Sequence, residues 1–227
     1  MIPRPENPVI VAVDVSRLDE AESTVRELAP YVGSIKVGLQ LFTAHGPDAV
    51  RRLASHAPVF LDLKLHDIPN TVREASRNVA ALGVSMFTVH ALGGAAMIAA
   101  AAQGSREGAE EAGVPPPLLA AVTVLSSVSG EELASSASLA FEAKSAGATA
   151  CVVSGEDVST VREVVGEAFC LIVPGIRPAG SNGHDQVRIL TPSEAIERGA
   201  DFLVIGRPIT SAEDPAGAAR SILASVR

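Results

Sequence analysis

Alternating opposite charges follow one of the most apolar segments of the sequence. Residues 59–61 (Val-Phe-Leu) are continuously hydrophobic, and Asp62, Lys64 and Asp67 come directly after them. Side chains two residues apart on a strand point the same way, so we expect Asp62 and Lys64 to lie together. Taken alone, the triplet has the ordinary explanation of a solvated ion pair. However, three charges at the end of a buried strand are costly to bury unless partners compensate them.

Strand-like and helix-like segments alternate along the whole chain. Eight apolar runs are predicted as strands: 9–13, 34–37, 59–63, 86–89, 118–124, 150–153, 169–173 and 202–205. Helical patterns separate them, with starts such as 16–19 (Ser-x-x-Asp) and 191–194 (Thr-Pro-Ser-Glu), which we interpret as capping boxes. This order predicts the α/β class and a (β/α)₈ TIM barrel that forms a single domain over residues 1–227. A doubly wound open sheet is the alternative, but no Gly-x-Gly-x-x-Gly follows the first strand.

The composition excludes some classes of protein. The chain has 227 residues, 47% of them hydrophobic, which suits one domain of barrel size. Its net charge of −8 argues against a general nucleic-acid binder, which needs a basic face. Cys151 and Cys170 lie in apolar runs, so we interpret them as core residues of a reduced compartment. No signal-peptide core and no membrane-length apolar run is found, so we expect a soluble, cytoplasmic protein.

In a barrel of this kind, chemistry collects where the strands end, and nearly every predicted strand ends in a polar group. In chain order these groups are Asp14, Lys36, Asp62 with Lys64 and Asp67, His90, Ser126 with Ser127, Arg177 after Pro174, and Arg207 after Gly206. Each has an ordinary explanation by itself: Asp14 could cap the next helix, and His90 could be a satisfied core histidine. Their gathering at one end of the barrel predicts an active site.

The last two strands predict a phosphate site. A glycine at Gly206 lets backbone N–H groups approach an oxyanion, while Arg207 supplies a planar fork of donors. Phosphate sites in TIM barrels are common at this position. The segment 177–190 is glycine-rich and polar, which is typical of a lid loop on the phosphate side, and Gln186 would meet the ligand on closure. An ordinary exposed loop is the alternative.

These residues and their order resemble the bacterial form of the orotidine 5′-phosphate decarboxylase family. The matching segments are spread over essentially the whole chain: 11–14, 36–42, 60–71, 89–94, 174–178, 185–192 and 204–210. One departure lies at Ser126, where bacterial relatives often carry Thr. A serine hydroxyl can still hydrogen-bond the edge of a pyrimidine.

The resemblance implies decarboxylation of orotidine 5′-monophosphate to UMP, the last step of de novo pyrimidine synthesis, with no metal or organic cofactor. The catalytic residues that the resemblance implies are Lys64, Asp62, Asp67 and Lys36. Lys64 would stabilise the carbanion at C6 and protonate it, and Asp62 would orient Lys64 and lie near the substrate carboxylate. Lys36 would connect Asp62 to the ribose hydroxyls. Further substrate-binding residues implied in this way are Asp14 and Lys36 at the ribose, Ser126 at the pyrimidine, Pro174, and Arg177, Gln186, Gly206 and Arg207 on the phosphate side.

The resemblance also implies a homodimer with shared active sites. In such a dimer Asp67, Ile68 and Thr71 would reach into the active site of the partner subunit. The alternative is an Asp67 that serves its own barrel or caps the helix beginning near Asn70.

Three other functions remain as alternatives. A Mg²⁺-dependent keto-sugar-phosphate decarboxylase of the same superfamily shares the Asp-x-Lys-x-x-Asp pattern, but typically has a carboxylate where Lys36 stands. A cation at that position repels Mg²⁺. A non-catalytic phosphosugar-binding barrel has no need of four charges packed together, and a structural or interaction protein leaves the polar rim unexplained.

Overall fold

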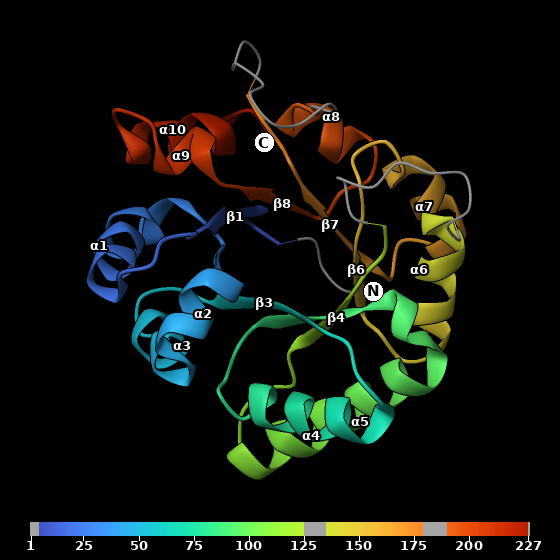
Figure 1. The fold of residues 1–227 in the computed structure, drawn as a ribbon. Coiled ribbons are helices and arrows are strands. Elements are labelled where there is room, and N and C mark those ends of the chain that lie inside the picture. The colour runs from blue at the N-terminus through green and yellow to red at the C-terminus, as the bar shows by residue number, and fades with distance from the viewer. Residues whose placement is uncertain (1–4, 125–134, 179–189, 227) are drawn as a thin grey trace.

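The strands of the chain close into a parallel barrel (Figure 1). The computed structural model describes residues 5–124, 135–178 and 190–226. The strands are β1 (Val9–Ala12), β2 (Ser34–Gly38), β3 (Val59–Leu65), β4 (Met86–His90), β5 (Leu118–Val122), β6 (Ala150–Val152), β7 (Cys170–Pro174) and β8 (Phe202–Ile205). Each pairs with the next in sequence, and β1 pairs with β8 to complete the ring. The predicted TIM-barrel fold class is confirmed.

The helices surround this ring on the outside (Figure 1). They are α1 (Leu18–Leu28), α2 (Leu39–His45), α3 (Pro47–Ala54), α4 (Pro69–Ala80), α5 (Gly94–Ala112), α6 (Ser136–Ser145), α7 (Val158–Val165), α8 (Pro192–Glu197), α9 (Arg207–Thr210) and α10 (Pro215–Ala224), with 3₁₀ turns η1 (Ala29–Tyr31) and η2 (Ala91–Gly93). In the described part of the chain, no helix combines the length and the apolar character that crossing a membrane requires.

Helix α3 illustrates why these segments are helical and face inward. Pro47 occupies the first turn, where its missing N–H is not needed. Asp48 lies in that turn and Arg51 and Arg52 in the last, as the helix dipole favours. Its three buried residues, Ala49, Val50 and Leu53, lie on one face and pack against the barrel.

Two apolar layers hold the barrel together. One fills the inside of the ring and the other lies between the strands and the helices. Cys170 belongs to the inner layer and Cys151 to the outer one. Burial raises the pKa of the Cys170 thiol to about 11 and raises that of Cys151 as well. Both thiols therefore stay protonated at neutral pH, as expected of core residues.

Helices α4 and α5 approach each other unusually closely. A Cβ atom on Gly104 would lie 2.0 Å from the backbone oxygen of Arg73, and one on Gly108 would lie 2.0 Å from that of Arg77. Arg73 also pairs with Glu107 at 2.7 Å. Helix α4 therefore packs against the glycines of α5. This contact fixes the position of α4, which begins directly after Asp67 and Ile68.

A buried arginine closes the end of the barrel where the strands begin. The guanidinium of Arg162 on α7 donates to the backbone oxygens of Gly199 and Phe169 and to the carboxylate of Asp201. Asp201 Oδ2 also accepts from the backbone N–H of Leu171 on β7, at 2.8 Å. In TIM barrels this end serves stability, whereas the opposite end carries chemistry.

The strand and helix ends differ from the predicted ones in a few places. The fifth strand stops at Val122, whereas β3 continues past the predicted end to Leu65. The prediction that 16–19 forms a capping box is wrong, because α1 begins with Arg17 as N-cap and has no side-chain cap. The capping box at 191–194 is confirmed, with Thr191 and Glu194 bonding each other's backbone N–H.

Candidate active site

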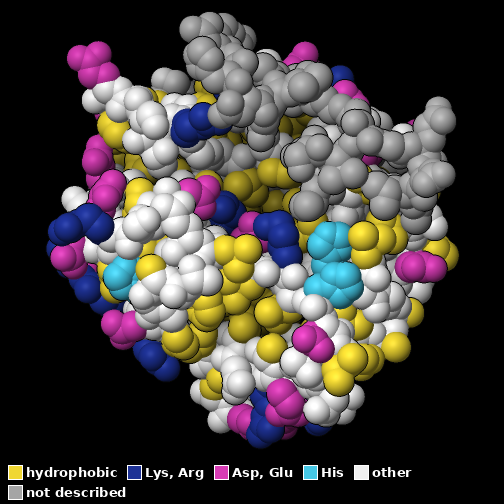
Figure 2. Space-filling view, in the orientation of Figure 1, with side chains coloured by type: hydrophobic (Ala, Val, Ile, Leu, Met, Phe, Trp, Pro, Cys, Tyr) yellow, Lys and Arg dark blue, Asp and Glu magenta, His cyan; other side chains and the backbone are white. Residues whose placement is uncertain are grey.

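A cavity of about 380 Å³ opens at the carboxyl ends of the strands. Figure 2 shows charged side chains of both signs gathered at the centre of this face. Eight of the residues predicted for the site line the cavity: Asp14, Lys36, Asp62, Lys64, Pro174, Arg177, Gly206 and Arg207. The volume is in the range of pockets that hold one small ligand.

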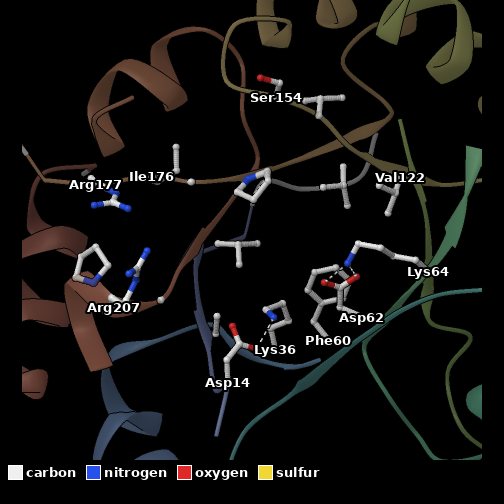
Figure 3. A pocket seen from close by; sticks show the side chains of 18 of the residues that line it. Asp14, Lys36, Phe60, Asp62, Lys64, Val122, Ser154, Ile176, Arg177 and Arg207 are labelled. Carbon is white, nitrogen blue, oxygen red and sulfur yellow. Dashed lines mark hydrogen bonds and ion pairs between the residues drawn. The ribbon is translucent and has the colours of Figure 1, made fainter. Parts of the chain in front are cut away.

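Asp62 and Lys64 form the most tightly bonded pair in the cavity. Lys64 Nζ lies 2.8 Å from both carboxylate oxygens of Asp62. The Asp62 side chain is only 15% exposed and that of Lys64 is 32% exposed, so both charges are partly withdrawn from water. An ammonium group held in this way carries its positive charge and its protons into the cavity (Figure 3).

Asp14 and Lys36 form a second ion pair at the ends of β1 and β2. Lys36 Nζ donates to Asp14 Oδ1 at 2.8 Å, and the Lys36 side chain is 12% exposed. Gly38 makes room for this pair, since a Cβ atom there would lie 3.1 Å from Asp14 Oδ1 and 3.1 Å from Lys36 Nζ. Gly38 did not stand out in the sequence, because its effect depends on a contact between neighbouring strands.

Two arginines line the cavity on the side away from Lys64 (Figure 3). Arg177 follows β7 and is buried, whereas Arg207 begins α9 and is exposed. Gly206, the residue before Arg207, lies just beyond β8. Planar guanidinium groups can donate paired hydrogen bonds to phosphate oxygens. The two arginines therefore make this side of the cavity a favourable binding site for a phosphate group.

The inner part of the cavity is apolar. Phe60, Val122, Val152 and Val204 line it alongside the charged residues. Charge–charge interactions are stronger in such surroundings than in water. In the described ranges, no cluster of three or more His, Cys, Asp or Glu side chains is arranged to hold a metal ion.

Asp67, Ile68 and Thr71 do not line the cavity of their own subunit. All three are exposed, and Ile68 leaves 66% of its surface in contact with solvent. Among the described residues, Asp67 Oδ1 accepts only from the adjacent Ile68 N–H, at 2.7 Å, and α4 has no side-chain cap. The alternative in which Asp67 caps this helix is therefore not what the structure shows.

Two of the predicted substrate-binding residues, Ser126 and Gln186, lie outside the described residues. Most of the segment 177–190, predicted as a lid, lies outside them too.

His90 does not line the cavity, and it is half-buried rather than part of the core. Its Nδ1 accepts from the backbone N–H of Leu92 at 3.3 Å, and its ring stacks on that of His66 with centroids 5.5 Å apart. Burial lowers the pKa of His90, and the nearby His66 and Lys64 lower it further. These effects favour the neutral form of the ring.

Thr88 on β4 is a second residue of the site, besides Gly38, that the sequence pattern did not indicate. It is 1% exposed, and its hydroxyl contacts both members of the central ion pair. The signal available was weak: a threonine two residues before His90 on an apolar strand also fits an ordinary β-branched core residue.

Comparison with known proteins gives consistent results. Residues 7–222 match the model of the orotidine 5′-phosphate decarboxylase / HUMPS family. The chain is 46% identical to an orotidine 5′-phosphate decarboxylase from Moorella thermoacetica, covering 96% of this chain and 91% of the relative. It is 48% identical to that from Syntrophotalea carbinolica, covering 95% and 93%. The crystal structure of the Lactobacillus acidophilus enzyme of this name superimposes with a TM-score of 0.85 at 38% identity, covering 97% of this chain and 99% of that one.

Proposed function

The chain belongs to the orotidine 5′-phosphate decarboxylase / HUMPS family, and from this premise we propose that it converts orotidine 5′-monophosphate to UMP and CO₂. The observation that carries the proposal is the Asp62–Lys64 pair, whose ammonium reaches into a cavity that two arginines line on another side (Figure 3). This arrangement suits a substrate with a reacting centre at one end and a phosphate at the other.

Lys64 carries the chemical step. When the bond between C6 and the carboxylate breaks, its electron pair stays on C6, where no adjacent carbonyl delocalises it well. A preorganised ammonium stabilises that charge as it develops and then transfers a proton to C6. Asp62, bonded to Lys64 Nζ through both oxygens, keeps the ammonium oriented.

The remaining cavity residues bind parts of the substrate that do not react. Asp14 and Lys36 bind the ribose hydroxyls, and Arg177, Arg207 and the Gly206 N–H bind the phosphate. Ser126 binds the pyrimidine and Gln186 the phosphate, and Pro174 belongs to the same substrate-binding set inferred from the sequence. Binding energy from the phosphate can offset the cost of ordering charges at the other end.

We further propose that the protein works as a homodimer in the cytoplasm. The dimer is supported by Asp67, Ile68 and Thr71, which are exposed and do not line the cavity of their own subunit. The cytoplasmic location is supported by the two free, buried cysteines, Cys151 and Cys170.

One assay tests the reaction against its alternatives. The purified protein is given orotidine 5′-monophosphate with excess EDTA, and the loss of substrate absorbance is followed. We expect turnover that EDTA leaves unchanged. Turnover abolished by chelation would indicate the metal-dependent alternative, and no turnover at all would overturn the proposal.

A further inference from the structure

Strand β3 is irregular at the point where it carries the charged residues. Leu61 pairs with Phe87 on β4, and the next pair is Leu65 with Val89. Three residues of β3, 62–64, therefore lie opposite one residue of β4, Thr88. A bulge of this kind interrupts the hydrogen-bonded ladder between two strands.

The irregular segment includes an uncommon backbone conformation. Lys64 has a φ of +52°, and it is the single described residue other than glycine with a positive φ. The left-handed region is unfavourable for lysine, because its Cβ atom comes too close to the following carbonyl oxygen. A residue stays there only where its surroundings hold it.

The hydroxyl of Thr88 provides such a constraint. The backbone N–H of Lys64 donates to Thr88 Oγ1 at 2.8 Å, and Oγ1 donates to Asp62 Oδ1 at 3.0 Å. One hydroxyl thus uses its acceptor and donor functions for two different groups of the site. Because Lys64 Nζ also binds Asp62 Oδ1, the three residues form a closed ring of hydrogen bonds.

We propose that Thr88 is a positioning residue for decarboxylation, which holds the Lys64 backbone and the Asp62 carboxylate so that the ammonium meets C6. This inference rests on the proposed function and deepens it. Without the hydroxyl, the partly buried backbone N–H of Lys64 loses its partner and one oxygen of Asp62 loses a donor. The strand then relaxes toward regular pairing, which displaces Lys64 from the reacting carbon.

The chain offers a matched control in Thr123, which follows β5. Thr123 is also fully buried, but its hydroxyl donates to the backbone oxygen of Val152 at 2.9 Å, and it bonds no charged group in the part of the chain that the structure describes. Thr123→Val therefore removes a buried hydroxyl from the same barrel without touching the ion pair.

The experiment compares Thr88→Val, Thr88→Ser and Thr123→Val with the unaltered enzyme. The measurements are kcat, KM, the dissociation constant of UMP and the melting temperature. We expect Thr88→Val to lower kcat about 10- to 100-fold, with UMP binding changed less than about threefold. Thr88→Ser keeps the hydroxyl, so its kcat should stay within about threefold of the unaltered enzyme, as should that of Thr123→Val.

Three outcomes would overturn the proposal. They are a Thr88→Val kcat within about threefold of the unaltered enzyme, a Thr88→Ser variant as slow as Thr88→Val, or a Thr123→Val variant that loses as much kcat as Thr88→Val. If Thr88→Val does not fold, Thr88→Ala is judged by the same limits. Failure of the proposed function itself is distinct, because the unaltered enzyme would then show no turnover.

Discussion

Lys64 combines an ion pair with an unfavourable backbone conformation, and both act on its ammonium group. If this ammonium stabilises the developing carbanion, Lys64→Ala should raise the activation free energy by at least about 3 kcal/mol, or lower kcat about a hundredfold or more. Binding of UMP, which carries no charge at C6, should weaken much less. The measurements are kcat and the dissociation constant of UMP, and a Lys64→Ala enzyme with near-normal kcat would disprove the assignment.

Arg207 belongs to the other side of the cavity, so its loss should have a different signature. Arg207→Ala should strongly lower kcat/KM for orotidine 5′-monophosphate and leave turnover of the phosphate-free nucleoside, orotidine, almost unchanged. Arg51, an exposed arginine of α3, is the control, and Arg51→Ala should affect neither substrate. Equal losses on both substrates would mean that Arg207 supports the fold instead.

At the scale of elements, the eight strands were predictable because their signal is local. A strand covered on both faces is a continuous apolar run, and β8 (Phe202–Ile205) has the predicted bounds. The end of β3 was not predictable, because the bulge at 62–64 is a feature of its pairing with β4, a strand that begins only at Met86, further along the chain. The two-residue period of a regular strand explains why Asp62 and Lys64 were expected to meet. In the structure they do meet, but Lys64 has a left-handed backbone conformation that a regular strand does not have.

Some residues of the candidate site could be predicted from the sequence, and others could not. The charged residues at the strand ends could be proposed as site residues because a charged side chain next to a buried strand is costly and has few structural roles there. Gly38 and Thr88 were missed because their importance comes from neighbours on other strands. A glycine or a threonine in a strand has many structural explanations, and the sequence does not contain the contact that decides among them.

The packing of α4 on α5 gives a prediction at this scale. Alanine is favoured over glycine inside a helix by about 1 kcal/mol, so Gly108→Ala would stabilise an isolated α5. In the protein the new Cβ would lie 2.0 Å from the Arg77 backbone oxygen. We therefore expect a loss of about 1–3 kcal/mol in the free energy of unfolding.

Chemical denaturation measures this loss. Glu110, exposed on the same helix, is the control, and Glu110→Ala should change stability by less than about 0.5 kcal/mol. A Gly108→Ala protein as stable as the parent would show that the two helices separate at little cost.

At the scale of the whole molecule, the exposed rim residues predict active sites built from two subunits. If Asp67 works in the partner's site, inactive Lys64→Ala and inactive Asp67→Ala chains should complement each other once subunits exchange. A mixed dimer then has one site with both changes and one site with neither. Random pairing of equal amounts should restore about a quarter of the original sites.

The control for this experiment is each variant mixed with itself under the same conditions. Exchange is demonstrated separately with differently tagged chains. If exchange occurs and no activity returns, Asp67 works in its own subunit and the shared site is wrong.

The pairing of β1 with β8 also has a consequence for synthesis. Val9 pairs with Leu203, so β1, the first strand to be synthesised, cannot complete its pairing until β8, the last strand, has been synthesised. Until Phe202–Ile205 has emerged, the nascent sheet keeps an unpaired edge at β1 and another at β7. Such edges are templates for pairing with other chains. A chain truncated before Phe202 would thus be an open sheet that is prone to aggregation, rather than a slightly smaller enzyme.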